Sequence, residues 1–147
     1  MKSHIRNRLA WLTLATAVAV LTTAAGARAA DAPADAVVAS PAKITHVGPD
    51  GAAKLIAEGK ITVLDLRTPD EFARGHIAGA RLLDCQAKDF AQTLGELDKT
   101  KTYLVHCASG GRSTQALKQF QKLGFQSVVH LDGGLSAWKR AGKPAAQ

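Results

Sequence analysis

The 147-residue sequence contains little cysteine and few aromatic residues, and it has no internal repeat. Two cysteines are too few to staple a small disulfide-rich domain, so a packed apolar core must hold the fold. With 46% hydrophobic and 21% charged residues, the chain is too apolar for a disordered protein. Its histidines and cysteines lack the spacing of a metal site, which predicts none. The length allows one domain.

Positive charge is in excess, but it is unevenly distributed. The net charge of +7 would by itself favour an acidic partner such as nucleic acid. Residues 1–29 hold no acidic residue and four basic ones, Lys2, Arg6, Arg8 and Arg28. The rest of the chain has 15 basic and 12 acidic residues, a net charge of +3, without a basic block. We therefore expect no nucleic-acid partner.

The amino-terminal segment has the three parts of an export signal. Basic residues precede an uncharged run, Leu9–Thr23, and Ala27 and Ala29 follow in the small-x-small spacing of a cleavage site. This order predicts a cleaved signal peptide over residues 1–29 and a periplasmic or secreted protein. An uncleaved anchor is the alternative, although the run is shorter than the roughly 20 apolar residues of a spanning helix. A cleaved protein would have no stable membrane insertion.

After a flexible leader over residues 30–42, short apolar runs alternate with helical patterns. The runs 61–66, 102–106 and 127–131 are rich in β-branched residues and nearly continuous, as in strands buried on both faces. Weaker strand candidates cover 44–47 and 80–83. The fold class predicted for residues 43–147 is therefore α/β, an open parallel sheet of about five strands with helices on both faces.

Helical segments occupy the intervals between these strands. Thr68-Pro-Asp-Glu71 is a helix start, because Thr68 can cap, Pro69 suits the first position and Glu71 can complete a capping box. The other expected helices cover 49–58, 89–97, 113–123 and 135–141. In such sheets, ligands bind at the carboxyl ends of the strands.

The loop Cys107-Ala-Ser-Gly-Gly-Arg112 stands at one of these ends, between a strand and a helix. Glycines at 110 and 111 can take positive φ and curl the backbone into an anion-binding nest, and the helix amino terminus adds a positive dipole end. Both favour a thiolate, so Cys107 is the expected nucleophile, and Arg112 can hold an oxyanion. The remaining expected binding groups are the backbone N–H groups of Ala108, Ser109, Gly110 and Gly111.

Three motifs now give a family resemblance. Asp65–Phe72 with Gly75–Ala80 resembles the first signature of a rhodanese domain, Cys107–Arg112 its active-site loop and Asp132–Trp138 its closing motif. The resemblance implies a rhodanese-like fold and a sulfurtransferase that needs no cofactor. Rhodaneses that move sulfur have a six-residue loop, as here, whereas their phosphatase relatives typically have one residue more.

The resemblance also implies a mechanism. The Cys107 thiolate would take sulfane sulfur from a small anionic donor such as thiosulfate, and the Cys107 persulfide would pass it to cyanide, a thiol or a thiol-bearing protein. Two alternatives remain: a phosphatase- or arsenate-reductase-like enzyme, which the loop length disfavours, and a noncatalytic interaction module that merely retains the thiol.

Other residues are expected near the loop. Arg67 resembles the family arginine at the active-site entrance and is predicted to bind substrate, with a structural ion pair as the alternative. Asp65 and Ser113 are predicted supports, the first orienting an arginine and the second bonding loop backbone. Cys85 could be a resolving thiol for Cys107 or an isolated small residue. His106 could tune the thiol, but a structural role is favoured.

Overall fold

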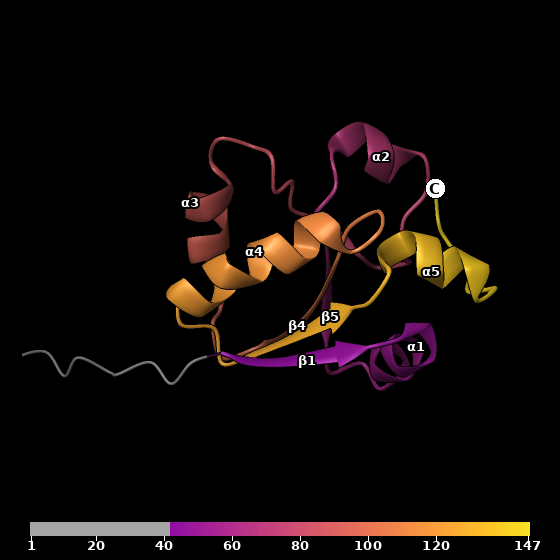
Figure 1. The fold of residues 1–147 in the computed structure, drawn as a ribbon, viewed down its shortest axis with the longest axis horizontal. Helices are drawn as coiled ribbons and strands as arrows, with labels where there is room; N and C mark the ends of the chain where they lie inside the picture. The colour runs from indigo at the N-terminus through magenta and orange to yellow at the C-terminus, as the bar shows by residue number, and fades with distance from the viewer. Residues whose placement is uncertain (1–41) are drawn as a thin grey trace, which may run out of the picture. The chain divides into compact units, whose positions relative to one another are not determined.

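The computed structural model describes residues 42–147, drawn in colour in Figure 1. The predicted signal peptide at 1–29 and the predicted leader up to residue 41 lie outside the described residues. Within the described part of the chain, no helix is long and apolar enough to cross a membrane.

Strands and helices alternate along the described chain. The strands are β1 (Lys43–Val47), β2 (Thr62–Asp65), β3 (Arg81–Leu82), β4 (Thr102–His106) and β5 (Ser127–Leu131). The helices are α1 (Pro49–Ala57), α2 (Pro69–Ala73), α3 (Phe90–Gly95), α4 (Gly111–Lys122) and α5 (Gly134–Arg140). All strand pairs are parallel, in the order β1-β5-β4-β2-β3. The α/β prediction is confirmed, including the number of strands.

Two apolar cores cover the two faces of the sheet. Successive strand residues alternate between them, so Leu104 packs in one core and Val105 in the other. Helices α3 and α4 contribute Phe90 and Phe120 to the first core, while α5 contributes Trp138 to the second. Figure 1 shows α3 and α4 on one side of the sheet and α1 on the other. Both faces are thus buried, which explains the continuous apolar strands.

The main departure from the predicted boundaries lies at the Cys107 loop. The helix predicted to begin at Ser113 begins at Gly111. Gly110, at φ +99°, is the residue before the helix, whereas Gly111, which was expected to be free for positive φ, is its first residue. Glycine adopts this left-handed backbone conformation at low energetic cost. The chain can therefore reverse at Gly110, and α4 can begin four residues after Cys107. The connection between β4 and α4 is consequently only residues 107–110.

Candidate active site

Cys107 follows β4 directly and lies at the amino-terminal end of α4. The residue is 1% exposed, and the Gly110 N–H donates to its Sγ at 3.2 Å. The Ser113 hydroxyl lies 3.5 Å from the same sulfur. The expected nest therefore forms around the thiol, with the dipole of the twelve-residue helix α4 behind it.

These hydrogen bonds decide the ionisation of Cys107. Burial acts to raise the pKa of the thiol, because it disfavours the charged form. The Ser113 hydroxyl and the backbone N–H groups of Ser113, Ser109 and Gly110 lower the pKa and outweigh burial. Since the net pKa lies below its ordinary value, Cys107 is a more available thiolate at neutral pH than a free cysteine.

Ser113→Ala should raise the pKa of Cys107, because it removes a hydrogen bond to the charged sulfur. We expect the pH midpoint of iodoacetamide alkylation to move upward and the rate at neutral pH to fall several-fold. The measurement uses a Cys85→Ser background so that only Cys107 reports. Thr114→Val is the matched control, because its hydroxyl donates to the Gly110 carbonyl at 2.8 Å instead. An unchanged midpoint in Ser113→Ala would contradict this role.

Arg112 is held by Glu71 in a bidentate ion pair. Its Nη1 and Nη2 donate to the two carboxylate oxygens at 2.8 and 2.7 Å, and both side chains are about a quarter exposed. Hydrogen bonding from Arg112 lowers the pKa of Glu71 to about 2, and the same pair raises the pKa of Arg112. Glu71 also completes the predicted capping box with Thr68. One carboxylate therefore both caps α2 and fixes the arginine of the loop.

Glu71→Gln should make the free energy of unfolding depend less on pH in the acidic range. Glu71 has a pKa of about 2 when folded and an ordinary value of 4.5. The unfolded chain thus protonates first, and the pair's contribution, complete above about pH 4.5, is lost as the pH falls towards 2. Glutamine keeps the cap but carries no charge. Urea unfolding across this pH window measures the effect. If the parent and Glu71→Gln lost equal free energy of unfolding across this pH range, the predicted contribution of the ion pair would be contradicted.

The start of α5 braces the back of the loop. The N–H groups of Leu135 and Ser136 donate to the carbonyls of Cys107 and Ala108, each at 2.9 Å. Gly134 has φ +58°, and a Cβ there would lie 2.5 Å from the Cys107 carbonyl oxygen. Only glycine allows this approach. These two hydrogen bonds fix the backbone conformation of the loop. In that conformation the N–H groups of Ser109 and Gly110 point at the sulfur.

Arg67 was predicted to bind substrate, with a structural ion pair as the alternative, and its contacts favour the ion pair. Its Nη2 and Nε donate to the fully buried carboxylate of Asp65, the shortest contact being 2.6 Å. One hydrogen each on Nη1 and Nη2 donates to the carbonyls of Glu71 and Gly75. Four of the five N–H groups of Arg67 are thus bonded inside the first motif, and the residue is only 5% exposed. Arg67 therefore links Asp65 at the end of β2 to the backbone of the first motif, and the Asp65 carboxylate fixes the orientation of its guanidinium.

Cys85 and Arg112 line the same cavity. Its volume is about 270 Å³, and the other lining residues are Gln86, Phe90, Gln115, Ala116 and Gln119. Burial gives the half-buried Cys85 thiol a raised pKa, whereas the pKa of Cys107 is lowered overall. Both cysteines are free thiols in the structure. Cys107 is not among the lining residues, and Arg112, at the start of α4, is the residue that connects the cavity with the Cys107 loop.

His106 is fully buried beneath the site. Its Nε2 lies 3.8 Å from Asp65 Oδ2 and has no hydrogen-bond partner in the described part of the chain. Burial lowers the pKa of this imidazole, so it stays neutral at ordinary pH. Its Nδ1 lies 3.2 Å from the Cys107 carbonyl oxygen, and no hydrogen bond from its ring to the sulfur is present among the described residues. The structural role favoured from sequence stays a prediction.

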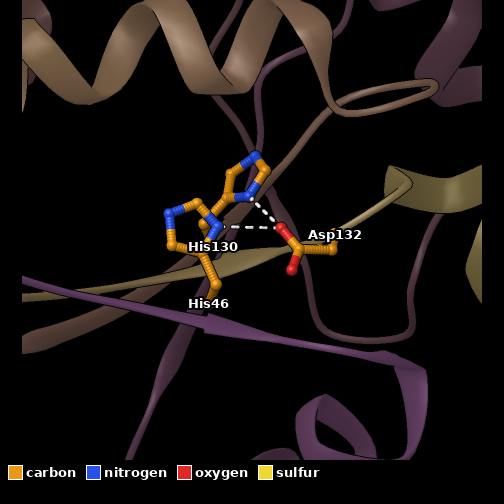
Figure 2. A group of neighbouring side chains, drawn as sticks. All are labelled: His46, His130 and Asp132. Carbon is orange, nitrogen blue, oxygen red and sulfur yellow. Dashed lines mark hydrogen bonds and ion pairs between the residues drawn. The ribbon is translucent and has the colours of Figure 1, made fainter.

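Two partners of the loop were missed by sequence reasoning. Glu71 was predicted only as a cap, although α2 and α4 start at the carboxyl ends of the neighbouring strands β2 and β4 and their first turns can meet. His130 was not singled out, yet its Nε2 lies 2.8 Å from Ser113 Oγ. Figure 2 shows its ring beside His46 and Asp132. The signal for His130 was its place in a central strand, where a polar residue needs a partner.

Comparisons with known proteins agree with this geometry. A family model described as the rhodanese-like domain matches residues 48–141. The chain is 35% identical over 85 residues to the "Probable adenylyltransferase/sulfurtransferase MoeZ" of Mycobacterium tuberculosis, covering 58% of this chain and only 22% of that protein. It is 35% identical over 94 residues to the thiosulfate sulfurtransferase GlpE of Ectopseudomonas mendocina, covering 64% of this chain and 84% of GlpE.

Solved structures give the same result. The crystal structure of a rhodanese-related protein from Thermoplasma volcanium superposes with a TM-score of 0.62 at 28% identity, covering 69% of this chain and 97% of that one. The same fold is indicated by three observations: the order of the strands in the sheet, the loop that follows β4 and the family match over residues 48–141. The chain belongs to the rhodanese-like domain family.

Proposed function

We propose that this protein is a sulfurtransferase that carries sulfane sulfur as a persulfide of Cys107. The observation that carries the proposal is the thiol itself, whose Sγ accepts the Gly110 N–H at 3.2 Å and whose pKa lies below the ordinary value. A thiolate in a ring of N–H donors is suited to attack sulfur and to hold the charged product. The similarity to GlpE, named a thiosulfate sulfurtransferase, supports the same reading.

The first half-reaction loads Cys107. The thiolate attacks the outer sulfur of thiosulfate, a bond forms between Sγ and that sulfur, and the sulfur–sulfur bond of thiosulfate breaks. Sulfite leaves with the electron pair of the broken bond. No proton is needed for this exchange, because the attacking group is already a thiolate. The N–H groups of Ser109 and Gly110 remain in place to stabilise the persulfide charge.

The second half-reaction unloads Cys107. A nucleophile, cyanide or the thiolate of a small thiol or protein, attacks the outer sulfur of the persulfide. The new bond forms to the acceptor, and the Cys107 thiolate leaves with the electron pair of the persulfide bond. Low basicity makes Cys107 a good leaving group as well as an available nucleophile. The same hydrogen bonds therefore serve both halves of the cycle.

We assign donor binding to Arg112 and the loop N–H groups. Arg112 lines the cavity of about 270 Å³, and its ion pair with Glu71 fixes its orientation. Two of its five N–H groups are used by the carboxylate, which leaves others for an oxyanion. Of the loop donors expected from sequence, Ser109 and Gly110 act on the sulfur in the resting thiol. Ala108 and Gly111 are included in the proposal for the bound donor.

We further propose that the protein works in the periplasm or outside the cell. The support is the order of basic residues, uncharged run and cleavage site in residues 1–29. Amino-terminal sequencing of protein recovered from an envelope fraction should begin at Ala30. An amino terminus at Met1 or Lys2 would contradict the predicted cleavage.

Incubation with thiosulfate tests the sulfur chemistry. Intact mass should increase by one sulfur atom, and peptide mapping should place that sulfur on Cys107. Adding cyanide should then release thiocyanate and restore the original mass. Aryl phosphate serves as the competing substrate, for which no hydrolysis is expected.

Cys85→Ser is the matched control, because it removes the other free thiol of the chain and leaves the loop intact. This variant should load to the same extent as the wild-type chain. No mass gain with thiosulfate or with a polysulfide would contradict the proposal. Loading that depends on Cys85 instead of Cys107 would contradict the assignment of the nucleophile.

A further inference from the structure

A second cluster of polar side chains lies at the same edge of the sheet. His46 Nδ1 and His130 Nδ1 lie 2.8 and 2.9 Å from the same oxygen of Asp132, Oδ1. Figure 2 shows both rings pointing at this carboxylate. The three atoms lie within 4.8 Å of one another, and in residues 42–147 this is the one group with such convergence of three potential metal ligands. None of the three takes part in the proposed sulfur chemistry.

The backbone holds these side chains together before any ligand binds. His46 and His130 are directly paired in register between the parallel strands β1 and β5, so their side chains lie on the same face. Their rings touch edge to face with centroids 5.0 Å apart. Asp132 follows β5, and its N–H donates to the Val47 carbonyl at 2.9 Å. Two of the three side chains thus stand on paired strands, and the third is tied to the end of β1 by a backbone hydrogen bond.

The outer contacts of the cluster also suit a metal ligand. His130 is 2% exposed, and its second ring nitrogen, Nε2, lies 2.8 Å from Ser113 Oγ. Histidines that bind metals commonly use their other nitrogen in such a bond, which fixes ring orientation and tautomer. Asp132 and His46 are each about half exposed, so an ion could enter from solvent and keep water ligands.

We propose that His46 Nδ1, His130 Nδ1 and Asp132 Oδ1 form a binding site for a divalent transition-metal ion of the zinc class. Two imidazoles and one carboxylate are a ligand set typical of zinc and its neighbours, and three protein ligands leave a position for water. The ion replaces the hydrogens now shared with Asp132. Each neutral imidazole then carries its proton on Nε2, where that of His130 donates to Ser113. The argument for this site does not rest on the proposed sulfur chemistry, although His130 contacts Ser113, whose hydroxyl also lies 3.5 Å from the Cys107 sulfur.

Zinc titration of the full chain tests the site. Cys85→Ser and Cys107→Ser are present throughout, so that thiolates do not bind the ion. Isothermal calorimetry and metal analysis after dialysis should both give one zinc ion per chain. His46→Ala and Asp132→Asn should each weaken binding by at least the roughly 10- to 100-fold that loss of an outer-shell partner costs. Both substitutions replace half-exposed side chains, so the fold should be retained.

Two controls make the result decisive. His76→Gln removes a histidine whose Nδ1 bonds the Phe72 carbonyl and whose ring stacks on Phe72, outside the cluster, and it should bind zinc as before. Zinc should also raise the unfolding temperature of the parent protein but not of Asp132→Asn. An absence of zinc binding by the parent would overturn the proposal. Equal affinity in the parent, His46→Ala and Asp132→Asn would overturn it as well, since the ion would then bind elsewhere.

Discussion

Cys107→Ser should lower the rate of thiocyanate formation from thiosulfate and cyanide by on the order of 10³-fold or more. Serine keeps the size of the side chain and the loop around it, but its hydroxyl stays protonated where the Cys107 thiol, with its lowered pKa, ionises. An alkoxide cannot form at neutral pH without a base aimed at it, and Ser113 Oγ, 3.5 Å from the sulfur, is no such base. The variant should therefore gain no sulfur from thiosulfate.

The control for this prediction must show that the Cys107→Ser variant is folded. Cys107 is 1% exposed, so a misfolded variant could also be inactive. Circular dichroism and the unfolding temperature should show that Cys107→Ser is folded, and Cys85→Ser should keep its rate within a few-fold of the parent. Residual transfer by a folded Cys107→Ser at more than a tenth of the parent rate would show that the nucleophile lies elsewhere.

The loop could be predicted because its chemistry is local in sequence. A strand, a cysteine, small residues and a helix start follow one another within a few positions, and the left-handed Gly110 realises the expected nest. The two-sided core was likewise readable, since Leu104 and Val105 are adjacent apolar residues that can only be buried on opposite faces. Short-range patterns thus predicted the fold class, which the structure confirms, and they pointed to Cys107 as the proposed nucleophile.

Contacts between distant segments were not readable in this way. Glu71 and Arg112 are 41 positions apart, and His46 and Asp132 are 86 apart, so no spacing links them. Their proximity follows from the parallel order of the strands, with β1 beside β5 and β4 beside β2. The same limit explains Arg67, whose distance from the rim depends on how its side chain turns back to Asp65. Sequence predicted the right edge of the sheet, but it could not predict which side chains would pair there.

Asp65→Ala should destabilise the fold by about 3–5 kcal/mol, the usual cost of removing one partner of a buried ion pair. Asp65 is 0% exposed, and Arg67 Nη2 and Nε both donate to its carboxylate. Without it, the guanidinium keeps only the carbonyls of Glu71 and Gly75 in a buried position. The charge then has no counter-ion, and the water that would solvate it is excluded. Urea unfolding with an unchanged m value measures the loss.

Asp50→Ala is the matched control, because Asp50 also forms an ion pair, with its Oδ1 2.7 Å from Lys143 Nζ. The side chain of Asp50 is 90% exposed, in contrast to that of Asp65. Water replaces that partner, so the cost should stay within about 1 kcal/mol. Asp65→Asn, which keeps the shape and one acceptor oxygen but not the charge, should fall between the two. If Asp65→Ala cost no more than Asp50→Ala, Arg67 would not depend on its counter-ion, and the assignment of this arginine as a buried brace would be wrong.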